Sequence, residues 1–423
     1  MQYYQQLKVV KYNTAGNQEN YLNEYKRRFN SETTYHTNLK PNLMRRGEFA
    51  TAGYPIFIVN LPEITLRTEQ ILTSTLEIKR LTAQLPNIAV SQFLIETMGN
   101  EIVSTNEIEG VQSTRQEVDD AIVAANDSKT NARLTSTVKK YQDILKGDFL
   151  HIENLEDIRI IYDELLKGEI NRADLPDGQL FRTNPVYIQG GNVDKKVLVA
   201  PTSEVEITHR LADWLMFING HDVPFLIKAL IGHYFFENTH PFYDGNGRTG
   251  RYILSMYLAR KLDIFTGISF SQSVRSNREK YYKAFSDTGD ADNFADGTSF
   301  VLELMEIISS RQSLIIQSLN ERATQLKRAK VHIMEQYTKN SPERHILYLL
   351  VQSRLFNDSD TTGIIDNEIK ELGKKRGLSA RSINQAFLQL TEAGIIDLIK
   401  RRPLQHVISR RYLAEIEKAP ETI

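Results

Sequence analysis

The chain has 423 residues, of which 41% are hydrophobic and 25% charged, and its formal net charge is −1. This balance is typical of globular protein with two or three ordinary domains, and the overall charge indicates neither a nucleic-acid nor a membrane partner. Because the chain has no cysteine, disulfides, thiolate catalysis and cysteine–zinc sites are excluded.

The start of the chain predicts where the protein works. Residues 1–8 lack the apolar core of a signal peptide, and no stretch approaches the roughly 18 apolar residues of a membrane-spanning helix. We therefore expect a cytoplasmic protein without a membrane partner.

The first third of the chain predicts helices after a polar start. Residues 1–60 mix tyrosine, asparagine and charged residues, so we expect an irregular arm on the surface. Gly110 is a natural helix stop. Apolar residues at helical spacing predict helices over 64–85, 91–103, 116–125, 132–145 and 154–166.

The pattern changes near residue 184. Two β-prone runs flank a Gly-Gly-Asn turn, which predicts a β-hairpin over 184–199. Residues 307–337 predict one long charged helix or a pair of helices. Helical spacing is also found over 203–219, 224–238 and 249–261, and around Tyr281 and Tyr282.

The C-terminal part has a different order of elements. Three helical patterns precede two strand-like segments, which is the order of a winged helix-turn-helix. The expected fold class is therefore mainly α, with a small β-hairpin and a C-terminal winged-helix-like domain. The C-terminal elements are expected over 344–350, 366–376, 379–393, 395–399 and 406–409.

One segment, residues 240–251, concentrates more chemistry than any other. Pro241 disfavours helical backbone at His240, so a preceding helix should end there and release the imidazole. With an ordinary pKa of about 6.5, this imidazole suits removal of a hydroxyl proton near neutral pH. We expect His240 to be the catalytic base and Phe242 to anchor the loop. The segment reads His-Pro-Phe-Tyr-Asp-Gly-Asn-Gly-Arg-Thr-Gly-Arg.

The remainder of this segment suits a polyphosphate. A Gly-Asn-Gly turn before a helix exposes backbone N–H groups as an anion-binding nest. Two arginines would bind phosphate oxygens as planar charged forks. Asp244 offers a hard oxygen ligand to Mg²⁺ shared with substrate phosphates. The expected nucleotide-binding residues are Asp244, Gly245, Asn246, Gly247, Arg248 and Arg251.

A metal site is a competing interpretation of the same stretch. On a continuous helix, His233, Glu237 and His240 would share one face. Pro241 argues against helical geometry at the third of these residues, and the spacing is not that of the two-histidine zinc-protease helix. We therefore expect His233 and Glu237 to support the loop instead.

The segment resembles the Fic family signature, His-x-Phe-x-Asp-Gly-Asn-Gly-Arg-x-x-Arg, at every position. Fic proteins are helical and usually transfer AMP from Mg-ATP to a hydroxyl side chain of a protein, with release of pyrophosphate. The resemblance implies a protein adenylyltransferase that uses ATP and Mg²⁺ and modifies a Ser, Thr or Tyr of a target protein or of itself. Removal of AMP and transfer of other phosphate-containing groups are alternatives within the same family.

A second match precedes this segment. Residues 105–110 read Thr-Asn-Glu-Ile-Glu-Gly, which is similar to the Ser/Thr-x-x-x-Glu-Gly/Asn pattern of the inhibitory helix in Fic proteins. The resemblance implies that Glu109 pairs with Arg251 and competes with the γ-phosphate for the same guanidinium. Gly110 would let the helix approach closely. The alternative is that Glu109 is a solvated helix charge.

The predicted hairpin over 184–199 is similar in position to the flap of Fic proteins, which aligns a target segment by strand addition and borders the nucleotide. An ordinary surface hairpin is the alternative. Tyr281 and Tyr282 resemble the aromatic pair on the adenine side in relatives, and we expect one of them only to pack. The nucleotide edge of the flap would be formed by Ile188, Gln189, Gly190 and Gly191.

The C-terminal part carries a local excess of positive charge. Residues 371–411 hold nine Lys or Arg and three acidic residues. The third helix would meet bases, and the turn at 400–402 would meet phosphates. DNA binding and protein docking or dimerisation both stay open for this part. The expected base-contacting residues are Arg381, Ser382, Asn384 and Gln385.

Four parts are therefore expected along the chain. They are an N-terminal arm with helices (1–90), a Fic-type core (91–310), a helical connector (311–340) and a winged-helix-like domain (341–423). The core would contain the inhibitory helix near 104–110. Two functions stay open: a self-restrained adenylyltransferase, and a DNA-binding regulator whose core senses nucleotide with little turnover.

Overall fold

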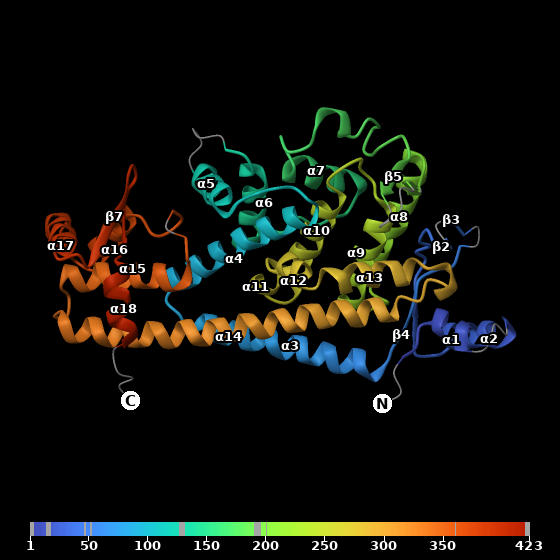
Figure 1. Ribbon diagram of the computed structural model, residues 1–423, viewed down its shortest axis with the longest axis horizontal. Coiled ribbons are helices and arrows are strands. Elements are labelled where there is room, and N and C mark those ends of the chain that lie inside the picture. Colours follow the sequence, from blue (N-terminus) through green and yellow to red (C-terminus); the bar gives the residue numbers. More distant parts are fainter. Residues whose placement is uncertain are drawn as a thin grey trace. The chain divides into compact units, whose positions relative to one another are not determined.

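The chain folds into a mainly helical structure with four small antiparallel sheets of two strands each among its described residues (Figure 1). The computed structural model describes residues 4–13, 18–45, 48–50, 53–126, 132–189, 196–199, 201–359 and 361–418. The chain divides into two compact units. The first comprises Met1–Thr75, Glu101–Thr114 and Arg133–Gln312, and the second Leu76–Asn100, Arg115–Ala132 and Ser313–Ile423.

This division differs from the boundaries expected from the sequence. Helices α3 (Pro62–Ala83), α4 (Asn87–Ile108) and α14 (Thr298–Gln336) each contribute residues to both units. A helix that continues across a boundary produces no linker-like change of composition, so its sequence does not reveal the division. The charged segment 307–337 forms one helix, α14, rather than a pair.

The N-terminal segment is not the irregular arm that its composition predicts. Two helices and four short strands form there, with β1 paired to β4 and β2 to β3. Leu7, Tyr21 and Phe57 form a buried cluster with Phe294. Local spacing cannot reveal such contacts with a distant segment. The elements are α1 (Leu7–Asn13), α2 (Gln18–Phe29), β1 (Thr34–His36), β2 (Met44–Arg45), β3 (Glu48–Phe49) and β4 (Phe57–Val59).

Two helices in the first unit, α9 and α10, position the 240–251 segment: residues 240–245 connect them, and residues 246–251 begin α10. Both are buried around most of their circumference, as expected for helices at the centre of a core. The starts of α7 and α8 are set by N-cap residues: the Asn154 and Ser203 side chains accept backbone N–H groups there. The helices are α6 (Thr135–Lys146), α7 (Leu155–Leu165), α8 (Glu204–Asn219), α9 (Phe225–Thr239), α10 (Asn246–Lys261), α11 (Ile264–Gly267), α12 (Phe270–Ser276) and α13 (Arg278–Gly289), with 3₁₀ turns at Arg172–Asp174 and Ala291–Asn293.

The predicted hairpin is present in the first unit. Strands β5 (Val186–Gln189) and β6 (Lys196–Val199) pair antiparallel, with Val186 opposite Val199 and Gln189 opposite Lys196. Its predicted turn, which includes Gly190 and Gly191, lies outside the described residues. No helix in the described part of the chain is long and apolar enough to span a membrane.

The second unit contains the C-terminal elements in the predicted order. Three helices precede a two-stranded sheet, and a further helix, α18, follows that the sequence analysis did not predict. Ser379 caps the third helix by accepting the Ser382 N–H at 3.0 Å. The elements of this unit are α5 (Arg115–Ala125), α15 (Pro342–Phe356), α16 (Asp366–Lys375), α17 (Ala380–Glu392), β7 (Ile396–Arg401), β8 (Leu404–Ile408) and α18 (Arg410–Lys418).

Candidate active site

His240 is released from helix α9 as its proline neighbour predicts. The helix ends at Thr239, and His240 adopts left-handed backbone with φ 53°. The buried Arg182 holds this turn: its Nε donates to the His240 carbonyl at 2.8 Å, and its backbone N–H donates to the Pro241 carbonyl at 3.1 Å. Arg182 therefore fixes the backbone from which the imidazole projects.

Phe242 and Asn246 fix the middle of the loop. Phe242 is fully buried and stacks on Tyr162, with ring centroids 3.8 Å apart. The Asn246 side chain accepts the Phe242 N–H at 2.9 Å and donates to the Phe242 carbonyl at 2.8 Å. Phe242 is thus placed as an anchor, and the Asn246 side chain is used to close the loop.

The expected nest takes the form of a helix N-terminus. Helix α10 begins at Asn246, three residues before the predicted start, after Gly245 with φ +82°. A Cβ on Gly245 would collide with the Leu166 side chain. The first N–H groups of a helix have no partner within it, and together with the helix dipole they favour an anion. The backbone at Gly247 belongs to this first turn.

Asp244 and Arg248 lie next to each other beside that turn. One Asp244 oxygen accepts the Gly245 N–H at 2.6 Å, and the other lies 3.5 Å from the Arg248 guanidinium. Arg248 is buried and also pairs with Glu169 at 3.3 Å. The Asp244 side chain is 45% exposed, which leaves its carboxylate open to a cation. Sequence reasoning missed Glu169, since no spacing pattern connects it to the loop.

Arg251 contacts two residues of the segment 105–110, Thr105 and Glu109. Its Nε donates to the Thr105 hydroxyl at 3.0 Å, and its Nη2 donates to the Thr105 carbonyl at 3.1 Å. The same Nη2 lies 2.9 Å from the Glu109 carboxylate. Arg251 is 2% exposed and the Glu109 side chain 26%, so Glu109 keeps contact with solvent while it is the charge partner of a buried guanidinium.

Gly110 and Gly247 lie near the Glu109–Arg251 ion pair, and glycine is required at these two positions for different structural reasons. Gly110 follows the end of α4 with φ +72°, and a Cβ there would meet nothing within 4 Å. The expectation that Gly110 allows close approach is therefore wrong, and its left-handed backbone is what requires glycine. Close approach occurs at Gly247, where a Cβ would collide with the Glu109 carboxylate. Glu109 thus lies directly against the first turn of α10.

His233 and Tyr281 form a buried pair behind the loop. The His233 Nε2 and the Tyr281 hydroxyl are 2.8 Å apart, and Tyr281 is 2% exposed. Tyr281 thus packs, whereas Tyr282 is 44% exposed, with the Arg278 guanidinium 5.7 Å from the centre of its ring. The described residues contain no group of three potential metal-binding side chains. This agrees with the left-handed turn that takes His240 off the helix.

Burial shifts the titration of two groups in the loop region. It lowers the pKa of His240 to about 4, and the Arg182 guanidinium acts in the same direction. The imidazole is therefore neutral at physiological pH, as a general base requires. Burial also raises the pKa of Glu237 to about 8, although the Arg251 charge opposes this shift. Both shifts follow from the cost of placing a charge in a poorly solvated site.

Of the expected flap residues, Ile188 and Gln189 lie in strand β5, and Gly190 and Gly191 are outside the described part of the chain. Residues just before strand β5 are hydrogen-bonded to the loop that begins at His240. The Tyr243 hydroxyl accepts the Asn184 N–H at 3.1 Å and donates to Asp177 at 2.8 Å. The variable Tyr243 of the motif is thus a contact that the sequence did not reveal.

His240 thus lies in the turn before a helix whose first two turns contain two buried arginines, in a mainly helical chain. Residues 152–258 match the model of the Fic/DOC family. The chain therefore contains a domain of the Fic/DOC family.

Curated relatives support this assignment over part of their length. "Protein adenylyltransferase Fic" of Drosophila willistoni is 30% identical over 173 residues, which are 38% of this chain and 33% of the relative. "Protein adenylyltransferase fic-1" of Caenorhabditis briggsae is 33% identical over 97 residues, or 23% of this chain and 18% of the relative. The alignments thus span about a third or less of these relatives.

Solved structures of Fic proteins resemble the chain at low sequence identity. A Fic family protein from Desulfovibrio desulfuricans G20 covers 83% of this chain and 97% of its own, with 17% identity and a TM-score of 0.48. Fic-1 from C. elegans covers 61% of this chain and 74% of its own, with 18% identity and a TM-score of 0.42.

Proposed function

We propose that this protein transfers AMP from ATP to a hydroxyl side chain of a protein and restrains itself through Glu109. The observation that carries the proposal is the position of His240 beside the N-terminus of α10, whose first three turns contain Arg248 and Arg251. The names of the curated relatives point to the same reaction. The same similarity supports a protein as the target, which would be another protein or the chain itself.

The reaction needs one base and a cradle for the leaving group. The acceptor oxygen bonds to the α-phosphorus while its proton passes to His240, and the bond from that phosphorus to the bridging oxygen of pyrophosphate breaks. The N–H groups of the first turn and the Arg248 guanidinium would stabilise the charge that develops on the phosphates. The backbone contacts of Arg182 and the Asn246 side chain keep the base and the cradle in fixed register.

Asp244 fits a magnesium ion that binds together with the nucleotide. Its half-exposed carboxylate is a hard oxygen donor, and the other ligands would be phosphate oxygens and water, because the described residues offer no larger donor group. When bound, the ion would neutralise phosphate charge.

The proposed restraint follows from the Arg251 contacts. A guanidinium that is paired with Glu109 and bonded to Thr105 has fewer donors for a γ-phosphate. The Glu109 carboxylate also lies against Gly247, and a phosphate at the same helix end would be repelled by its charge. Both effects disfavour the productive position of ATP without removing any catalytic group.

Incubation with Mg²⁺ and ATP labelled at the α-phosphate tests the transfer. We expect label on the chain or on a lysate protein in the Glu109→Gly background. His240→Ala in that background should abolish it, and His209→Ala, an exposed histidine on α8, should not. Equal labelling by the two histidine variants, or no protein-bound label in any variant, would refute the proposal.

DNA binding is a second candidate function for the second unit. Arg381, Asn384 and Gln385 are exposed on one face of α17, and Arg401 and Arg402 are exposed at the hairpin turn. Ser382 is less suited than expected, because its hydroxyl donates to the Ser379 carbonyl. If DNA binds, Arg381→Gln should weaken binding of a labelled duplex and rising salt should release it. No binding at low salt would exclude this function.

A further inference from the structure

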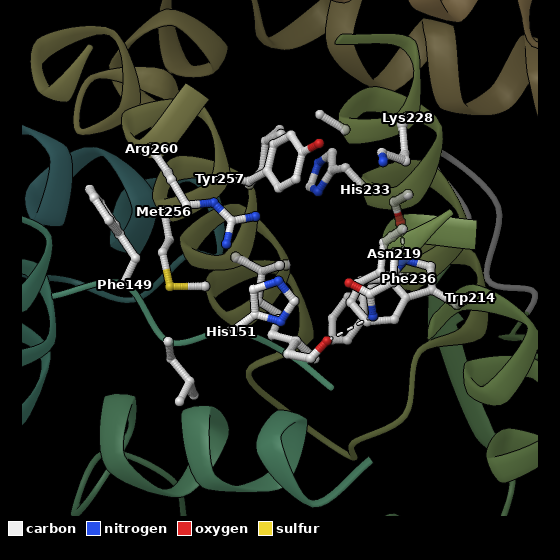
Figure 2. Close-up of a pocket in the computed structure, with 18 residues that line it drawn as sticks. Phe149, His151, Trp214, Asn219, Lys228, His233, Phe236, Met256, Tyr257 and Arg260 are labelled. Carbon is white, nitrogen blue, oxygen red and sulfur yellow. Dashed lines mark hydrogen bonds between the residues drawn. The ribbon is translucent and has the colours of Figure 1, made fainter. Parts of the chain in front are cut away.

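The first unit contains a pocket that the proposed reaction does not use. Figure 2 shows it between helices α8, α9 and α10 and the segment 149–152. Of the candidate active-site segment 240–251, only Gly250 lines it. None of the residues expected to act as base or to bind phosphate is among its lining residues.

The pocket is mostly apolar and its volume is modest. Its interior volume is about 50 Å³, several times the roughly 10–15 Å³ that one water molecule requires on this measure. Such a space suits a ligand of a few heavy atoms and is too small for a nucleotide, since a cavity that binds one benzene ring measures about 150 Å³. Its apolar lining includes Phe149, Trp214, Ile218, Phe236, Ile253 and Met256.

The charges at the pocket are all of one sign. Lys228 and Arg260 line it, and no acidic side chain does among the described residues. Burial lowers the pKa of Lys228, and the neighbouring charges of Lys261 and Arg260 lower it further. None of these three cations has an ion pair with a described acidic residue. An anion at the pocket would relieve their mutual repulsion.

Polar groups are available to orient such a ligand. Figure 2 draws the Arg260 guanidinium directed into the pocket, and the group lies 5.3 Å from the centre of the Tyr257 ring. The Tyr257 hydroxyl is buried and has no hydrogen-bond partner among the described residues. The Lys228 ammonium donates to the Gly220 carbonyl at 2.6 Å and has further donors to offer.

We propose that this pocket binds a small carboxylate with a compact apolar body. The apolar part would lie against Trp214 and Phe236, and the carboxylate would meet Arg260 and Lys228 at the pocket edge. A mostly apolar pocket with a few convergent polar groups is the usual form of a small-molecule site. Because the pocket walls belong to α9 and α10, the ligand would contact the two helices that carry the candidate active site.

The chain contains a single tryptophan, and it lines this pocket, so its fluorescence reports occupancy directly. We would titrate the full chain with propionate and follow Trp214 emission, with calorimetry as a second readout. We expect saturable binding by both methods. The neutral isostere propanamide should bind about tenfold more weakly, since a charge-assisted contact is worth about 1.4 kcal/mol or more.

Two variants test the site itself. Arg260→Gln, at an exposed position, should weaken propionate binding about tenfold. Lys26→Gln, an equivalent loss of an exposed cation on α2, should not change it. Ala229→Leu should fill the pocket and remove the Trp214 response while calorimetry shows no binding.

Equal affinity for the acid and the amide would overturn the proposal, as would an unchanged affinity in Arg260→Gln. Absence of saturable binding to the folded wild-type chain would also overturn it. None of these results depends on AMP transfer, so the pocket and the proposed reaction can fail separately.

Discussion

Arg251 and Glu109 form an ion pair of 2.9 Å across the candidate active site, with the arginine 2% exposed. Each partner belongs to a different sequence match, and Thr105, which is in the same match as Glu109, also binds the guanidinium. A buried arginine that loses its carboxylate partner keeps its charge, so it becomes free to attract another anion. This relationship connects the proposed inhibitory segment 105–110 to the proposed phosphate cradle.

Thr105→Val should release part of the restraint. The change removes the hydroxyl that accepts the Arg251 Nε and keeps the side-chain volume, so stability should fall by about 1–2 kcal/mol. AMP transfer should rise, but less than in Glu109→Gly, because the Thr105 carbonyl still holds the guanidinium. Thr97→Val on the same helix, whose hydroxyl bonds the Phe93 carbonyl, is the control. A rate equal to wild type in Thr105→Val would contradict the prediction.

The pH dependence of transfer should show no loss near pH 6.5. The folded-state pKa of His240, about 4, lies below the ordinary value of about 6.5. The imidazole therefore remains a neutral base as the pH falls and becomes protonated only as the pH approaches 4. In Glu109→Gly we expect kcat/KM to stay level from pH 8 to about 5. An acid limb with a midpoint near 6.5 would show that His240 titrates normally.

Glu237→Gln should stabilise the protein at alkaline pH. The folded-state pKa of Glu237, about 8, lies above its unfolded value of about 4.5, so its stabilising contribution is complete below pH 4.5 and is lost as the pH rises to 8. The amide of Glu237→Gln does not titrate, so the stability of the variant does not fall in this way as the pH rises. Its advantage in free energy of unfolding should grow by on the order of 1 kcal/mol per pH unit in that window. Denaturant unfolding at pH 5 and pH 8 measures it, and an advantage that does not change with pH would contradict it.

The sequence predicted the parts of the site that local signals encode. Pro241 marks the end of α9, and the family resemblance implies the pairing of Glu109 with Arg251. The contact of Thr105 with Arg251 was not predicted. The contacts of Glu169 with Arg248 and of Arg182 with the His240 carbonyl could not be predicted. They join segments 79 and 58 residues apart, and no periodicity connects such pairs.

The same reasoning explains the errors in the fold. The N-terminal helices depend on contacts of Tyr21 and Tyr25 with Phe294, so their sequence alone looks like a polar arm. Helix α10 begins earlier than its apolar spacing indicates, because its first turn is composed of polar motif residues that are buried by the loop. Apolar periodicity detects packing against a core and does not detect a helix start made of polar residues.

The most direct test of the central claim compares AMP transfer by Glu109→Gly and Glu107→Gly with that of the wild type. Glu107 is the matched control, because it is an exposed carboxylate in the last turn of α4, which ends at Ile108 just before Glu109, and it pairs with Arg275. We predict that Glu109→Gly raises the rate at least tenfold and that Glu107→Gly leaves it within about twofold. Equal rates in the two variants would contradict the proposal that Glu109 holds the site off by occupying Arg251.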